Sequence, residues 1–320
     1  MFLPRLNIYL AALLFACCPL HIYAQTRVPT PADSRRAQDT VLDASVRREI
    51  TAFKGKVSLY AKNLDTGASY GVNADERVRT ASTIKTAIMV EAFARVSEGH
   101  AKWSDEIVLT KEKKVPGAGV LQEMADGLHL TLRDAVNLMM TVSDNTATNL
   151  VLDVLTTDAV NRRMDALGLK KTRSLQKIGG AGKSHAAEDP VNKNFGIGVT
   201  TPREMVTLLE KLAQGEIVSA SVSKEMIDLM KREQSREGIG RTLWRVPKAT
   251  KSGALDHLRS DVGIFYTARG RIALAITCDD IPEIEWTIDN PGRLLASRLS
   301  LLLIAGLGSE KTQASEGAKQ

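Results

Sequence analysis

Ser82-Thr83-Ile84-Lys85 is followed along the chain by Ser143-Asp144-Asn145 and then by Lys251-Ser252-Gly253. The pattern S-x-x-K of the first string also occurs at Ser174–Lys177 and at Ser221–Lys224, so this pattern alone is weak. The second and third strings occur nowhere else, and only the first S-x-x-K has both of them downstream. As an ordered set they indicate a serine nucleophile, its proton-handling partners and an anion-binding strand.

The periodicity around these strings predicts the fold class. The chain has 320 residues, of which 43% are hydrophobic, so it can bury a sizeable core. Alternation of apolar residues predicts two hairpins. Apolar residues at helical intervals predict helices before, between and after these hairpins. The hairpins are expected at 56–72 and 262–277, and the helices at 41–53, 83–96, 132–155, 158–167, 202–212 and 291–307. We therefore predict an α+β fold, in which terminal helices flank an antiparallel sheet made from both ends of the chain, beside an all-helical lobe.

The domain organisation follows from composition. Arg5 and an apolar run before Ala24 predict a signal peptide over residues 1–24, too short for a stable membrane span. An alternative is lipidation at Cys17, because the residues before it resemble a lipoprotein cleavage box. Residues 25–40 are expected to be a flexible lead-in, 41–308 one catalytic domain with its helical lobe at about 82–212, and 309–320 a polar tail. The protein is thus expected to be periplasmic or secreted, and monomeric.

The charge distribution and the residue composition argue against nucleic acid, metal ions and cofactors as binding partners. The net charge of +6 is spread among interleaved acids, and aromatic residues make up 4% of the chain. No basic stripe or stacking platform for nucleic acid is visible. The five histidines show no metal spacing, and removal of the signal peptide would leave Cys278 as the single cysteine, so we expect no metal, no cofactor and no intrachain disulfide. Trp103, Trp244 and Trp286 are expected to be packing residues.

Ser82 and Lys85 are three residues apart in the first turn of a predicted helix, so their side chains should face the same way and touch. A serine alcohol needs a base to take its proton as it attacks a carbonyl. A lysine shielded from water loses its proton more readily and can be that base. The alternative is that Ser82 simply caps the helix.

Ser143-Asp144-Asn145 interrupts an apolar helical pattern with three polar residues. We expect Ser143 to pass a proton to the leaving nitrogen, and Asn145 to bind the substrate amide and to steady Lys85. The alternative is a helix N-cap at Ser143 or Asp144.

Lys251-Ser252-Gly253 lies where strand signals resume. A cation and a hydroxyl there suit a substrate carboxylate, and the glycine would let a substrate approach the backbone closely. The backbone amides of Ser82 and Ala254 are expected to stabilise the oxyanion. Arg259 could add a second positive contact, or could be an ordinary surface residue.

With these strings, their order and Thr200-Thr201-Pro202-Arg203 opening a later helix, the chain resembles the class A β-lactamase and penicillin-binding protein superfamily over roughly residues 41–307. The resemblance implies the fold, an exported location and β-lactam substrates, with the roles above carried by the matching positions.

One departure concerns the loop before Thr200. Class A enzymes keep an E-x-x-L-N string there, whose Glu activates the water that hydrolyses the acyl-enzyme. Residues 178–199 lack that string and contain only Glu188 and Asp189 as acids. We take Glu188 as the candidate replacement base, although Asp189-Pro190 behind it is typical of a turn. The alternatives are a D,D-peptidase or esterase-like hydrolase with slow β-lactam deacylation, and a non-catalytic module that binds peptidoglycan peptides.

Overall fold

The computed structural model describes residues 31–308, with side chains from Gln38 onward. The signal peptide predicted for residues 1–24 and the tail predicted for 309–320 lie outside these residues. Between 31 and 308, the structure contains no helix that is both long and apolar enough to cross a membrane.

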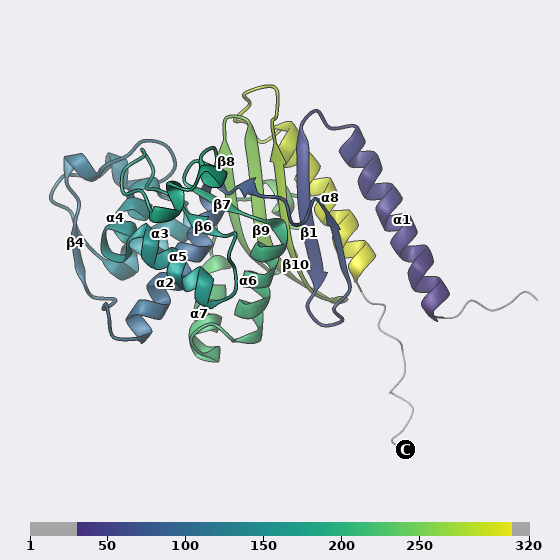
Figure 1. Cartoon of the computed structure of the whole chain (residues 1–320), viewed down its shortest axis with the longest axis horizontal. Helices are drawn as coiled ribbons and strands as arrows, with labels where there is room; N and C mark the ends of the chain where they lie inside the picture. The colour runs from purple at the N-terminus through teal and green to yellow at the C-terminus, as the bar shows by residue number, and fades with distance from the viewer. Residues whose placement is uncertain (1–30, 309–320) are drawn as a thin grey trace, which may run out of the picture.

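A five-stranded antiparallel sheet forms one side of the molecule, with the strand order β2-β1-β10-β9-β8 (Figure 1). Both predicted hairpins are confirmed, and the second one occupies the middle of the sheet. The first hairpin joins it from the other end of the chain, because β1 pairs with β10 along its whole length. The strands are β1 (Lys56–Asn63), β2 (Ser69–Val72), β8 (Lys248–Leu255), β9 (Leu258–Thr267) and β10 (Gly270–Asp279).

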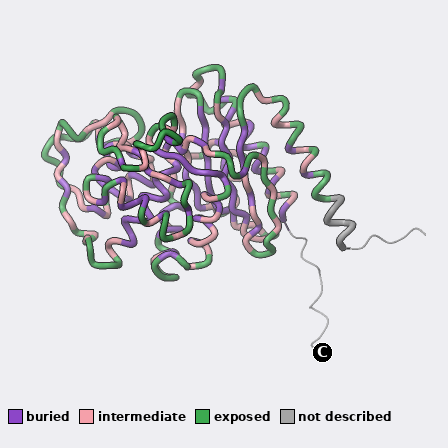
Figure 2. Tube along the Cα trace, viewed as in Figure 1, coloured by how far each residue is buried: buried purple, intermediate pink, exposed green. Residues whose placement is uncertain are grey.

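The central strands are apolar on both faces because both faces are covered. In β10, Ile272, Leu274 and Ile276 belong to the cluster under the terminal helices, whereas Ala273 and Ala275 belong to the core of the helical lobe. This alternation follows from the two-residue repeat of a strand. Figure 2 shows the resulting buried layer running through the sheet and into the lobe.

Helices α1 (Pro31–Thr51) and α8 (Pro291–Leu307) cover one face of the sheet, with α1 packed against α8 (Figure 1). Helix α6 (Pro202–Gln214) packs on the opposite face, against β1 and β10, and connects the sheet to the helical lobe. The other helices of the lobe are α2 (Lys85–Ser97), α3 (Leu132–Thr141), α4 (Asn145–Leu155), α5 (Thr157–Ala166) and α7 (Ala220–Met230). The strings 82–85, 143–145 and 251–253 meet at the seam between sheet edge β8 and this lobe.

Two short sheets and six 3₁₀ turns complete the described chain. Several of them add side chains to the core, among them Ile84, Ile107 and Leu121. The strands are β3 (Val78–Arg79), β6 (Arg173–Ser174) and β7 (Gly198–Thr200) in one sheet, and β4 (Glu106–Val108) and β5 (His129–Thr131) in the other. The turns are η1 (Ala81–Ile84), η2 (Lys111–Lys113), η3 (Leu121–Glu123), η4 (His185–Ala187), η5 (Pro190–Asn192) and η6 (Gly238–Gly240).

Several predicted boundaries were wrong. Helix α1 begins at Pro31, so residues 31–40 are helical rather than an irregular lead-in; Leu42 and Val46 on the same helix are buried against the sheet side. The helix predicted over 132–155 is two helices with a break at 142–144. Helix α7 was not predicted, although Ser219 caps it in the way a start signal requires.

Candidate active site

Nine of the ten predicted site residues lie together at the seam between β8 and the helical lobe. A cavity of about 640 Å³ opens there. Lys85 and Lys251 lie directly behind its wall, both fully buried. The predicted residues that line the cavity are Ser82, Ser143, Asn145, Ser252, Gly253, Ala254 and Arg259.

Ser82 lies in η1, just before α2, and faces the cavity. The capping alternative is wrong, because Thr80 and Ile84 occupy the cap positions of η1 and α2. Lys85 Nζ donates to the Ser143 carbonyl (2.7 Å), Asn145 Oδ1 (3.1 Å) and Ser143 Oγ (3.2 Å). These bonds tie Lys85 to the Ser143–Asn145 string, and its proximity to Ser82 stays a prediction.

The surroundings of Lys85 favour its neutral form. Burial away from water lowers its pKa well below the ordinary value, and the nearby charge of Lys251 lowers it further. Asp144 and Glu233 act in the opposite direction and are outweighed. A buried lysine of this kind can act as a base, because its neutral form is the one that accepts a proton.

Ser143 occupies the break between α3 and α4 with φ +56°, a left-handed conformation that is rare for serine. This conformation turns both of its oxygens toward Lys85. Its hydroxyl also accepts from Lys251 Nζ at 3.1 Å. Ala81, next to Ser82, has φ +45° as well. Strained backbone of this kind is maintained by surrounding contacts and is frequent at active sites.

Asp144 is the N-cap of α4, so the capping alternative is confirmed for this residue. Its carboxylate accepts from Ala147 N (2.7 Å) and, across the loop, from Val120 N (2.6 Å) and Leu121 N (2.9 Å). Asp144 thus fixes the loop that contributes Gly117 and Ala118 to the cavity. Its role is structural.

Asn145 connects Lys85 to the same loop. Its Oδ1 accepts from Lys85, its Nδ2 donates to the Pro116 carbonyl at 3.0 Å, and its backbone N donates to the Ala118 carbonyl at 2.9 Å. The predicted contact with Lys85 is therefore present. Pro116 takes one of the two donors of the amide that was expected to bind substrate, and Asn145 lines the cavity.

Glu233 is a site residue that the sequence did not reveal. It follows α7 and its Oε1 accepts three hydrogen bonds, from Lys251 Nζ (3.1 Å), Ser252 Oγ (2.8 Å) and Ser252 N (2.6 Å). The third donor of Lys251 is used by the Ser252 carbonyl at 2.9 Å. Glu233 therefore holds the cation and hydroxyl of the Lys251–Gly253 string in place.

Gly253 is required by a close approach within the protein. A Cβ on Gly253 would lie 2.8 Å from the Thr80 carbonyl oxygen and 2.9 Å from Ser82 N. The glycine was predicted to make room for a substrate. The structure gives a different reason: it lets β8 contact the backbone that bears the nucleophile.

The two residues expected to supply the oxyanion donors, Ser82 and Ala254, both line the cavity. Because β8 is the last strand of the sheet, alternate amides point off its free edge, and Ser252 N does so toward Glu233. Ala254, two residues on, has its amide on the same edge, and Ser82 N lies beside Gly253. This arrangement can stabilise an oxyanion between Ser82 and Ala254.

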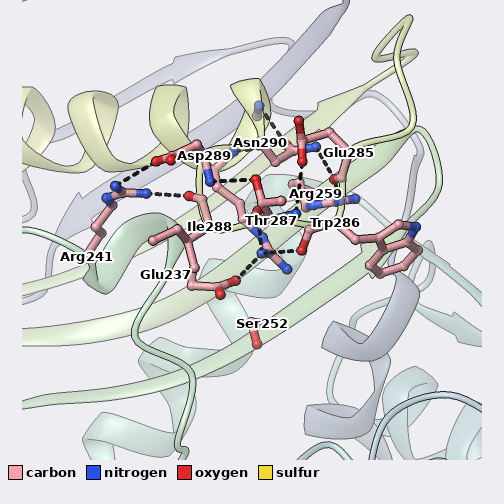
Figure 3. A network of polar contacts seen from close by, with 12 residues as sticks. Glu237, Arg241, Ser252, Arg259, Glu285, Trp286, Thr287, Ile288, Asp289 and Asn290 are labelled. Carbon is pink, nitrogen blue, oxygen red and sulfur yellow. Dashed lines mark hydrogen bonds and ion pairs between the residues drawn. The ribbon is translucent and has the colours of Figure 1, made fainter.

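Arg259 lines the cavity but its guanidinium is used within the protein. Nη1 donates to the carbonyls of Leu255 (2.5 Å) and Leu258 (2.7 Å), and Nη2 donates to that of Glu285. The Trp286 ring lies 4.8 Å from the guanidinium carbon. Arg259 is buried, so the surface alternative is wrong, and its contacts brace the loop drawn in Figure 3.

Glu188 is not part of the site. It follows η4, its side chain is exposed, and it does not line the cavity. Asp189, next to it, caps η5 by accepting from Val191 N at 3.0 Å. The turn indicated by Asp189-Pro190 is confirmed, and this turn directs both acids outward.

Asp261 is a second acid that the sequence did not reveal. It lies on β9 opposite Ser252 and lines the cavity. Burial raises its pKa to about 7, and the charge of Glu233 contributes to the rise. Its Oδ2 accepts from Ile239 N at 3.2 Å and lies where a Cβ of Gly238 would be, at 1.8 Å. The 238–239 backbone thus packs directly on this carboxyl.

The tryptophans divide into two groups. Trp103 packs edge to face on Phe93 with ring centroids 4.7 Å apart, as expected of a packing residue. Trp244 and Trp286 are 65% and 54% exposed, so the packing prediction is wrong for both. Trp286 also lines the cavity.

Comparison with known proteins agrees with this geometry. Residues 41–306 match the model of the β-lactamase enzyme family. The chain is 24% identical to β-lactamase AER-1 of Aeromonas hydrophila over 234 residues, covering 71% of this chain and 73% of the relative.

Among solved structures, a β-lactamase from Sphaerobacter thermophilus is 28% identical with a TM-score of 0.72, over 83% of this chain and 97% of that one. PBP-A is 27% identical with a TM-score of 0.72, over 83% and 95%. A variant of PBP-A, solved as an acyl-enzyme complex with penicillin G, is 26% identical with a TM-score of 0.70, over 83% and 96%. The family match covers most of the chain, and the chain therefore belongs to the β-lactamase enzyme family.

Proposed function

We propose that the protein is a serine hydrolase that opens β-lactam rings through an acyl-enzyme on Ser82. The observation that carries the proposal is the convergence of two buried lysines on Ser143 Oγ beside a cavity that exposes Ser82. This arrangement supplies a nucleophile, a base and a proton relay at one place. Membership of the β-lactamase enzyme family supports the substrate class.

Acylation begins when Ser82 Oγ attacks the lactam carbonyl and its proton goes to neutral Lys85. The lowered pKa of Lys85 favours the neutral form that this transfer requires. The carbon–nitrogen bond of the ring then breaks, and Ser143 Oγ gives a proton to the leaving nitrogen. Ser143 regains a proton from Lys85, with which it is already in contact at 3.2 Å.

Charge on the carbonyl oxygen and the substrate carboxylate is stabilised from the β8 side. The amides of Ser82 and Ala254 donate to the developing oxyanion. Lys251 has no spare donor, because Ser143, Glu233 and Ser252 take all three. Lys251 therefore contributes its field to carboxylate binding, and Ser252, which lines the cavity, is the residue that the carboxylate approaches.

Hydrolysis of the acyl-enzyme needs a base for water, and Glu188 is not retained in that role because it is exposed and away from the cavity. We assign the role to Lys85, which is hydrogen-bonded to Ser143 behind the cavity wall. After Ser143 has lost and regained its proton, Lys85 is again neutral and can accept a proton from the attacking water.

The position of Glu188 also favours a second candidate, a D,D-peptidase of the same fold that deacylates slowly. Its substrate would be a peptidoglycan peptide, and β-lactams would remain on Ser82. PBP-A is a structural relative, and a variant of it has been solved as an acyl-enzyme complex with penicillin G.

Intact mass spectrometry after mixing with penicillin G separates the two candidates. Ring-opened product together with unmodified protein is expected for the β-lactamase. A persistent adduct on Ser82 would assign the peptidase. Ser82→Ala is the control and should give neither product nor adduct; turnover by this variant would overturn both mechanisms.

We also propose export through a signal peptide ending at Ala24, with no requirement for a partner chain. N-terminal sequencing of protein recovered from the periplasm of an expressing bacterium should begin at Gln25. A lipidated Cys17 at the N-terminus would contradict this cleavage. Expression should raise the penicillin concentration that a susceptible host tolerates, and the Ser82→Ala variant should not.

A further inference from the structure

Trp286 presents a large apolar surface to the catalytic cavity. Its side chain belongs to the loop 282–290, between β10 and α8, and is 54% exposed while lining the same cavity as Ser82. Exposed aromatic surface beside a reaction centre is available for contact with substrate.

The loop that bears Trp286 is fixed by arginines from three other positions (Figure 3). Arg259 donates to the Glu285 carbonyl, and Arg293 donates to the carbonyls of Trp286 (3.3 Å) and Thr287 (2.8 Å). Arg241 donates to the Ile288 carbonyl and pairs with Asp289 at 2.9 Å. Four consecutive carbonyls are thus held, so the loop needs little further ordering when a ligand arrives.

The ring itself is also held. It stacks over the Arg259 guanidinium at 4.8 Å, and that guanidinium is in turn bonded to Leu255 and Leu258 at the tip of the β8–β9 hairpin. Arg293, which fixes the Trp286 carbonyl, is ion-paired with Glu237, and both residues line the cavity. The aromatic face is therefore a preformed part of the wall.

The neighbouring apolar residues of the loop behave differently. Ile284 and Ile288 are 58% and 55% exposed, close to the value for Trp286, yet neither lines the cavity. All three residues are exposed to solvent. Of the three, Trp286 alone lines the catalytic cavity.

We propose that Trp286 is a specificity-determining residue that contacts an apolar, preferably aromatic, substituent of the substrate. The proposal rests on the proposed function, because the substrate is taken to be a β-lactam. A rigid aromatic wall gains affinity from planar apolar groups without losing side-chain freedom, so aryl-bearing substrates are favoured over methyl-bearing ones.

The test uses two pairs of β-lactams. In the first pair, the two compounds differ only in the acyl side chain, which carries benzyl in one and methyl in the other. In the second pair, they differ only in the substituent on the leaving-group side, which is phenyl in one and methyl in the other. The ratio of kcat/KM for aryl over methyl is measured for the wild type, Trp286→Ala, Trp286→Phe, and the controls Ile284→Ala and Ile288→Ala. Affinity for the same compounds is measured by calorimetry in a Ser82→Ala background, where no turnover occurs.

We expect Trp286→Ala to lower the aryl-to-methyl ratio by about tenfold in one pair, with Trp286→Phe retaining most of it and both isoleucine controls unchanged. The pair that loses its preference identifies the end of the substrate beside Trp286. Unchanged ratios in both pairs, with normal turnover, would overturn this inference alone. Failure of every compound to bind or react would overturn it together with the proposed function.

Discussion

Lys85 and Lys251 share the hydroxyl oxygen of Ser143, from which their ammonium nitrogens lie 3.2 Å and 3.1 Å. Both lysines are fully buried. Two positive charges in such a place repel each other, and Glu233 neutralises only the one on Lys251 directly, at 3.1 Å. The repulsion is relieved when Lys85 gives up its proton, which is the state that a base requires.

The first prediction concerns Lys85 and pH. Protonated Lys85 cannot accept a proton from Ser82, so the acylation rate should rise with pH through a midpoint below 10.5, the ordinary lysine value. Lys85→Ala should lower this rate by about 10³-fold and remove the dependence. Stopped-flow acylation by penicillin G between pH 5 and 10 measures both. An unaltered profile in the variant would exclude Lys85 as the base.

The second prediction concerns Glu233→Gln. The charge of Glu233 raises the pKa of Lys85, so its removal should lower that pKa further and move the rising limb of acylation to lower pH. The amide oxygen can still accept from Ser252, which limits the structural damage. The same pH series measures the shift. Glu225→Gln, on an exposed carboxylate paired with Arg133, is the matched control and should not move the limb.

The third prediction concerns Gly253→Ala. The new methyl group would press on Ser82 N and on the Thr80 carbonyl, and so displace one oxyanion donor. We expect acylation to slow by about 10²-fold, the usual effect of losing one such donor. Circular dichroism and thermal denaturation establish that the fold is kept. A folded variant that acylates at the wild-type rate would show that the Ser82 amide does not act as a donor.

The fourth prediction concerns Asp261→Asn and stability. Burial raises the pKa of Asp261 from 3.8 to about 7, so between these values the folded state holds a proton that the unfolded state releases. This group therefore favours folding at low pH, and its contribution is lost as pH rises toward 7. The neutral asparagine avoids the loss while keeping an acceptor for Ile239 N.

Denaturant unfolding of both proteins at pH 4 and pH 8 measures this effect. The free energy of unfolding of Asp261→Asn, relative to that of the wild type, should rise by about 4 kcal/mol between pH 4 and pH 8. A difference between the two proteins that stays constant with pH would contradict a raised pKa.

The fifth prediction concerns Glu188→Gln. Because Glu188 is exposed and does not line the cavity, the variant should deacylate at the wild-type rate. The decay of the penicillin G adduct, followed by mass spectrometry, measures this. A decay slowed by tenfold or more would return Glu188 to the mechanism.

The sequence predicted the residues whose chemistry is carried by short strings. Ser82, Ser143 and Lys251 stand in ordered patterns, and the structure brings them together. Glu233 was missed because it stands in a charged stretch, Lys231-Arg232-Glu233, with no local feature to distinguish it. Its role depends on a contact between residues 233 and 252 that only the packing of α7 against the sheet creates.

Other signals were present but not used. Asp261 is an acid directly before the apolar residues 262–265 of β9. An acid next to buried strand residues is expected to be paired with a cation or to have a raised pKa. Glu188 was favoured because it was one of the two acids in its loop. The local turn at Asp189-Pro190 places the Glu188 side chain toward solvent. The spacing of residues along the sequence does not show this orientation.

The pairing of β1 with β10 has a consequence for how the chain folds. The two strands are separated by about two hundred residues of sequence. Apart from β10, the sheet neighbour of β1 is β2. The sheet can close only after β10, which ends at Asp279 of the 320 residues, has been synthesised. Such distant pairings lose a large amount of chain entropy before their stabilising contacts form, so folding should be slow. The nascent chain should remain without its sheet until synthesis is nearly finished.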